Sequence, residues 1–143
     1  MHPYTLFDII GPRIVGPSSS HTAGAARLGN VARRVLGQPV CEAEITLYGS
    51  FAKTGKGHGT DKAILAGLLG FAPDDLRIRT AYEEARAAGL EVQVQFSAQE
   101  AAHPNTARIR ARGADGRCID LVGVSLGGGL IEVRRLNGME VIF

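Results

Sequence analysis

Three consecutive serines followed by a histidine form the first segment of this sequence that could carry chemistry. The segment contains Ser18, Ser19, Ser20, His21 and Thr22, and small residues follow it. A helix is predicted to begin here, and the free N–H groups and positive dipole end of a first helical turn favour a carboxylate or phosphate. A lone serine at this place would be no more than a helix cap. Three hydroxyls, a histidine and small residues together favour an anion-binding turn.

A glycine-rich stretch at residues 49–62 is the second such segment. Its glycine spacing is one residue longer than that of a phosphate-binding P-loop, and Gly57 stands where that motif needs a serine or threonine, so a P-loop is excluded. Glycines flank His58, whose imidazole suits proton transfer near neutral pH. An exposed loop histidine is an equally good interpretation of His58, and Lys53 by itself is better explained as a solvated charge.

Three later features are weaker signals. Residues 103–106, with the sequence His-Pro-Asn-Thr, read by themselves as a turn with an asparagine cap. Arg108, Arg110 and Arg112 alternate along a predicted strand, which indicates a positive face that is either solvated or turned toward another subunit. The glycines at 127–129 either permit close approach of a ligand or bend a strand.

Composition limits the classes of function. With 143 residues and 45% hydrophobic content, the chain is expected to form one domain over residues 1–143. A net charge of +2, without aromatic residues among the arginines, argues against nucleic acid as a partner. Neither a membrane span nor a signal peptide is recognisable, so a cytoplasmic location is expected. Cys41 and Cys118 lie far apart, which excludes a disulfide framework or complete metal site and favours two small core residues.

The elements that must position these residues follow from hydrophobic periodicity. Helices are predicted at 25–36, with Gly37 as the stop, at 60–70, and from a cap at Asp74 or Asp75 to Gly89. Strands are predicted at 43–48, 90–97 and 107–112, then, after a link at Asp115-Gly116, in a segment that runs through 124, and at 130–136 and 139–143, and residues 49–59 are expected to be a loop. Asn137-Gly138 predicts a tight hairpin. The order indicates an α+β fold with a mixed, largely antiparallel sheet and helices packed on it.

The motifs, in this order, resemble a known family. Residues 16–24, 47–54, 57–62 and 103–106 closely resemble the beta subunit of iron–sulfur-dependent L-serine dehydratase, and the likeness extends over essentially the whole chain. The first two motifs are specific, whereas the later ones corroborate. Beta chains of this family usually continue into a small regulatory domain of the ACT type, and we expect position 143 to lie at the boundary before it.

The resemblance implies a deamination shared between two chains. L-serine loses water to give aminoacrylate, whose imine form hydrolyses to pyruvate and ammonia. In this family an open iron of a [4Fe–4S] cluster acts as a Lewis acid on the departing hydroxyl, and cysteines of an alpha subunit hold that cluster. Two scattered cysteines cannot hold it here. The isolated chain is therefore expected to be inactive, to need an alpha partner and to work as a homo- or hetero-oligomer.

Carried onto this sequence, the resemblance assigns candidate roles. His21 and His58 are candidates for proton transfer or orientation of the substrate. The substrate-binding candidates are Ser18, Ser19, Ser20, Thr22, Lys53, Thr60 and Asn105. The implied fold is similar to the allosteric substrate-binding domain of some phosphoglycerate dehydrogenases. Two rivals remain, namely a non-catalytic module of the same fold that binds a small anion, and a pyridoxal-phosphate enzyme in which Lys53 forms the Schiff base.

Overall fold

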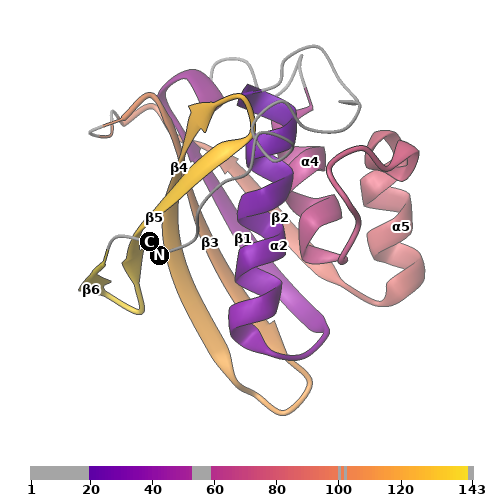
Figure 1. The fold of residues 1–143 in the computed structure, drawn as a ribbon. Coiled ribbons are helices and arrows are strands. Elements are labelled where there is room, and N and C mark those ends of the chain that lie inside the picture. The colour runs from indigo at the N-terminus through magenta and orange to yellow at the C-terminus, as the bar shows by residue number, and fades with distance from the viewer. Residues whose placement is uncertain (1–19, 53–58, 100, 102, 142–143) are drawn as a thin grey trace.

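A six-stranded sheet with helices packed on one of its faces forms the described part of the chain (Figure 1). The computed structural model describes residues 20–52, 59–99, 101 and 103–141. The helical elements are η1 (Ser20–Gly24), α2 (Ala25–Leu36), α4 (Thr60–Leu68), η2 (Leu76–Thr80) and α5 (Ala81–Ala88). The strands are β1 (Val40–Tyr48), β2 (Glu91–Phe96), β3 (Asn105–Gly113), β4 (Cys118–Gly127), β5 (Leu130–Leu136) and β6 (Met139–Glu140). The predicted α+β class is confirmed.

The sheet is mixed, as predicted, and its order is β2-β1-β3-β4-β5-β6. Only the β1–β2 pair is parallel among these strands, because the chain returns through α4 and α5 before β2, and the other neighbours are antiparallel. Consequently β1 ends at Tyr48 beside the start of β3 at Asn105 and near the end of β4 at Gly127. We call this side of the sheet the upper edge, as it is drawn in Figure 1.

The core lies between the sheet and the helices. Alternate strand residues face the helices, and Ile45, Ile109 and Leu121 are completely buried there. Leu28 from α2 and Ile64 from α4 fill the other side of the same cluster. The opposite face of the sheet carries charged side chains. This one-sided burial produces the alternating pattern on which the strand predictions depended.

The helix ends follow the glycine signals in the sequence. Gly37 caps α2 in the left-handed conformation, with φ of 79°, and its N–H group donates to Arg33 O. Gly89 closes α5 in the same way, with φ of 78°. Helix α2 begins at Ala25, as predicted, but Gly24 is itself helical and the wide turn η1 precedes α2 without a break. The first N–H groups of this helical stretch therefore belong to the turn that begins at Ser20.

Several predicted elements needed correction. The helix expected from Asp74 or Asp75 onward is split, because Asp75 caps the short 3₁₀ turn η2 and a separate helix begins after Thr80, whose φ and ψ of −113° and 31° are not helical. Residues 49–52, expected to be loop, form a helical turn, and β1 begins at Val40, before the predicted start. Among the described residues, no helix is long and apolar enough to cross a membrane.

Candidate functional site

The upper edge brings together the starts of two helices and the ends of three strands. The turn η1 packs against α4 and β4, and α4 also contacts β1. Asn105, at the start of β3, forms a bridge with Gly49 just beyond the end of β1. Asn105 shares its strand face with Ala107 and Ile109, which are buried against the helices. The side chain of Asn105 therefore lies on the helix side of the sheet.

Close backbone contact holds η1 on β4. A Cβ atom added to Gly24 would lie 2.1 Å from the Ser125 Oγ atom, so a larger residue at position 24 would push the turn away from the sheet. Ser125 itself is completely buried. The small residues after the serine run thus have a packing role, since they bring the backbone of η1 directly onto β4.

Three polar atoms are buried without a partner near this edge. Among the described residues, the buried side-chain atoms that lack a hydrogen bond are Thr22 Oγ1, Thr60 Oγ1 and Asn105 Oδ1. Thr22 is 2% exposed and Thr60 is 0% exposed. Leaving such a group unpaired costs roughly 1–3 kcal/mol, so proteins rarely tolerate it without a use. All three residues belong to the segments that the sequence had singled out.

Asn105 is positioned by the residues just before it. Its backbone N–H group donates to the His103 Nδ1 atom over 3.0 Å, which leaves the proton of a neutral imidazole on Nε2. The Thr106 hydroxyl donates to His103 O and thereby closes the same turn. Gly49 has φ of 58°, and a Cβ there would lie 2.5 Å from Pro104 O. The end of β1 therefore accepts only glycine if this turn is to fit against it.

The first turn of α4 is tethered to α5. The Tyr82 hydroxyl donates to Asp61 Oδ2 over 2.6 Å, and burial, together with this hydrogen bond, raises the pKa of Tyr82 above its usual value. Asp61 lies in the first turn of α4, where its negative charge complements the helix dipole. This contact fixes the helix start that carries Thr60.

The donor and acceptor types at this edge match a small zwitterion. Threonine hydroxyls and the helix start can donate to a carboxylate, whereas an amide oxygen can only accept, as from an ammonium group. Thr22 and Thr60 supply the first type of atom and Asn105 supplies the second. Together they provide the atom types that the two charged groups of an amino acid would need.

The other candidate residues are only partly covered by the described structure. Ser18, Ser19, Lys53 and His58 lie outside the described residues. For Ser20 and His21 the description is limited to the backbone of η1.

The sequence had not singled out Ser125 for the site, and it had read His103 only as part of a turn. A buried serine on a strand gives no local signal, and the role of His103 depends on a contact that only the folded turn creates.

The cysteines do not contribute to the upper edge. Cys41 lies near the start of β1 and is half-buried, and Cys118 begins β4 and is exposed, so both lie toward the opposite edge of the sheet. The prediction that both are core residues is wrong, because Cys118 is exposed at the start of its strand and Cys41 is half-buried and outside the core cluster. Within the described ranges, no group of three or more His, Cys, Asp or Glu side chains could hold a metal ion. An iron–sulfur cluster therefore does not fit the described residues of this chain.

By its fold and by the polar atoms buried at its upper edge, the chain falls in the class of α+β domains with a candidate polar-ligand site at one sheet edge. Comparison with known proteins narrows that class. The sequence matches the family described as "Serine dehydratase beta chain" over residues 5–100. This chain belongs to that family.

Relatives that match nearly the whole chain agree with the family. The chain is 50% identical over 137 residues to the "Probable L-serine dehydratase, beta chain" of Bacillus subtilis, which covers 96% of this chain and 62% of that relative. It is 42% identical over 144 residues to the "L-serine dehydratase, beta chain" of Peptoniphilus asaccharolyticus, covering 100% of this chain and 65% of that relative. The chain thus spans less than two thirds of the length of either relative.

Proposed function

We propose that this chain is the beta part of an L-serine dehydratase and supplies the substrate-binding half of its active site. The reaction would convert L-serine into pyruvate and ammonia through loss of water. The observation that carries the proposal is the set of unpaired buried atoms on Thr22, Thr60 and Asn105. These residues lie within the motifs of a serine dehydratase beta chain, and their atoms match the carboxylate and ammonium groups of serine.

Each residue at the upper edge has a proposed role. The hydroxyls of Thr22 and Thr60 donate to the serine carboxylate, and the Asn105 amide oxygen accepts from the ammonium group. Ser18, Ser19, Ser20 and Lys53 keep the substrate-binding role that the family resemblance implies. His21 and His58 take part in proton transfer or orient the substrate. His103 holds the backbone of Asn105 in place through its Nδ1 atom.

An alpha partner belongs to the same proposal. A [4Fe–4S] cluster would act as a Lewis acid toward the leaving hydroxyl when the alpha chain is bound. Ligation of the cluster by cysteines of the alpha chain is part of the proposal. The isolated chain is then inactive. A cytoplasmic location is part of the proposal. So is a fold like the allosteric substrate-binding domain of phosphoglycerate dehydrogenases, which the packing of helices on one sheet face supports.

The test is anaerobic co-expression with the alpha partner, followed by turnover assays with L-serine and L-threonine. His21→Ala and His58→Ala are each expected to lower serine turnover by about 100-fold or more, the usual range for a proton-transfer group. Serine turnover by the purified beta chain alone would contradict the division of the site. Unchanged turnover in both histidine variants would indicate the non-catalytic binding module instead.

A further inference from the structure

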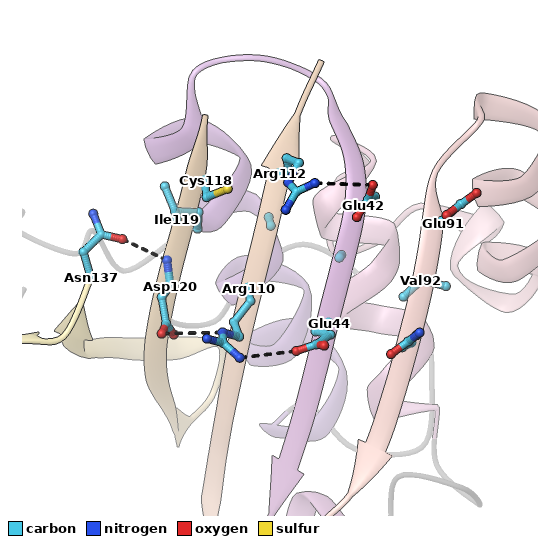
Figure 2. A pocket seen from close by; sticks show the side chains of 13 residues that line it. Glu42, Glu44, Glu91, Val92, Arg110, Arg112, Cys118, Ile119, Asp120 and Asn137 are labelled. Atoms are coloured by element: carbon cyan, nitrogen blue, oxygen red, sulfur yellow. Dashed lines mark hydrogen bonds and ion pairs between the residues drawn. The ribbon is translucent and has the colours of Figure 1, made fainter. Parts of the chain in front are cut away.

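The face of the sheet that carries no helix has its charges arranged in columns (Figure 2). Acidic residues line β1, where Glu42 and Glu44 are exposed. The neighbouring strand β3 carries Arg108, Arg110 and Arg112 on the same face, and the helices lie behind both strands in this view. A hollow of about 590 Å³ lies over Glu42, Glu44, Arg110 and Arg112 and over the adjacent parts of β2 and β4.

The contacts within the chain do not account for this arrangement. The Arg110 Nη1 to Glu44 Oε1 distance is 3.5 Å and the Arg112 Nη1 to Glu42 Oε1 distance is 3.8 Å, and all four side chains are at least half exposed. The Arg110 Nε atom also lies 3.7 Å from Asp120 Oδ2, so Arg110 has two loose partners within the chain. Such open pairs contribute little to the stability of the folded chain. By contrast, the guanidinium group of Arg108 donates two short hydrogen bonds to the Asp120 carboxylate, from Nη2 over 2.6 Å and from Nε over 2.9 Å.

The two columns are complementary to themselves. Glu42 lies opposite Arg112, and Glu44 opposite Arg110, in the register of β1 with β3. A two-fold axis parallel to the strands, placed between β1 and β3 in the plane of contact, exchanges these columns while it keeps each residue at its level along the strands. Arg110 of each copy then faces Glu44 of the other copy, and Arg112 of each copy faces Glu42 of the other.

The flanking strands fit the same symmetry. The axis places β2 of one copy over β4 of the other, so Glu91 faces the uncharged Cys118, and the Gln93 amide faces the Asp120 carboxylate. No like charges meet in these four strands. A two-fold axis perpendicular to the strands would instead stack arginines on arginines and glutamates on glutamates, which is repulsive.

We propose that this open face is a docking surface for a second copy of the same chain, in a face-to-face dimer whose two-fold axis runs along the strands between β1 and β3. Arg110 and Glu44 of the two copies alternate around the axis as a four-membered charge network. Because these side chains stay partly hydrated, the contact is wet, moderate in affinity and sensitive to salt. The dimer does not depend on the proposed catalytic role of the chain.

The test is a charge-swap experiment on the full chain, read out by analytical ultracentrifugation at about 0.1 M and about 1 M ionic strength. One variant is Arg110→Glu with Arg112→Glu, and the second is Glu42→Arg with Glu44→Arg. Each variant alone is expected to raise the dimer dissociation constant at least about tenfold, because like charges face each other. An equal mixture restores dimers, since all-acidic columns then meet all-basic ones.

Two further variants separate specific pairing from a change in net charge. A chain with all four substitutions has its columns exchanged and is expected to dimerise like the original chain. Arg79→Glu with Arg86→Glu makes the same change of net charge at exposed helical positions and should leave dimerisation unaltered. A monomer at concentrations up to about 0.5 mM at low salt, or a mixture that stays monomeric, would overturn the proposal.

Discussion

Gly29 and Gly67 face each other where α2 crosses α4. A Cβ atom on Gly67 would lie 3.0 Å from the Gly29 Cα atom and 2.1 Å from Ala26 O, and a Cβ on Gly29 would lie 2.2 Å from Ile64 O. The side-chain amide of Asn30 fastens the same crossing by donating to Gly67 O over 3.0 Å. This close approach sets how the two helices that carry the polar upper edge lie relative to each other.

Gly67→Ala is expected to destabilise the chain by at least about 2 kcal/mol, because the added methyl group meets backbone atoms that cannot rotate away. Urea unfolding followed by circular dichroism measures the change. The matched control is Gly116→Ala, where nothing lies within 4 Å of the added Cβ and only a φ of 89° opposes the change. That control should cost about 1 kcal/mol. Equal losses in the two variants would contradict the tight crossing.

Thr60→Val is expected to keep or increase the stability of the isolated chain, by up to about 1 kcal/mol, because it replaces an unpaired buried hydroxyl with a methyl group of the same shape. Thr106→Val is the control, since the Thr106 hydroxyl is bonded to His103 O. The control should lose about 1 kcal/mol. Thermal unfolding of both variants distinguishes a hydroxyl kept for a ligand from one kept for the fold, and a clear loss of stability in Thr60→Val would argue for the fold.

Tyr82→Phe is expected to cost about 1 kcal/mol, because it removes the hydrogen bond to Asp61. Asp61→Asn leaves an oxygen that can still accept this bond, so its loss should be smaller. Chemical denaturation of the two variants gives the comparison. If the asparagine variant were the less stable of the two, the negative charge at the start of α4 would matter more than the tether.

Stability should fall in acid through Asp120. The two hydrogen bonds from Arg108 hold the pKa of the Asp120 carboxyl below its usual value. The folded chain therefore binds fewer protons at this site than the unfolded chain, whose pKa is about 3.9. The stabilisation is complete above that value and is lost as the pH falls through the lower, folded-state pKa.

The measurement is the free energy of unfolding between about pH 6 and pH 3 for the original chain and for Asp120→Asn. Because the Arg108–Asp120 pair is partly exposed, the original chain should exceed Asp120→Asn in unfolding free energy by about 1 kcal/mol at about pH 6. This difference should become smaller as the pH falls toward about 3. A constant gap would show that the pKa of Asp120 is not lowered in the folded chain.

Local signals were strong enough to predict several elements from the sequence. Periodic apolar residues and Gly37 gave the bounds of α2 as the structure has them. Asn137 and Gly138 have φ of 52° and 83°, the left-handed pair that a tight hairpin needs. Thr22, Thr60 and Asn105 were named as candidates through the family resemblance, since residues 103–106 by themselves read only as a turn with an asparagine cap.

The remaining features depend on contacts between distant residues, which one sequence does not reveal. The close approach of Gly24 to Ser125 and the crossing of Gly67 with the backbone of α2 each join residues that are far apart in the sequence. The apolar period continues through Thr80 and so gives no signal for the break between the turn η2, which Asp75 caps, and α5. The arginines of β3 were recognised as a charged face, but the register that pairs them with β1 needs the folded sheet.

The most direct test of the substrate-binding role is the kinetics of serine turnover by the anaerobically assembled enzyme with Thr60→Val in its beta chain. The control is Thr46→Val on the opposite face of the sheet. Loss of a hydrogen bond to a charged group of the substrate predicts a fall in kcat/KM of about 10-fold or more for Thr60→Val, and no change for the control. Kinetic constants that match those of the original enzyme in both variants would contradict a serine site at the upper edge.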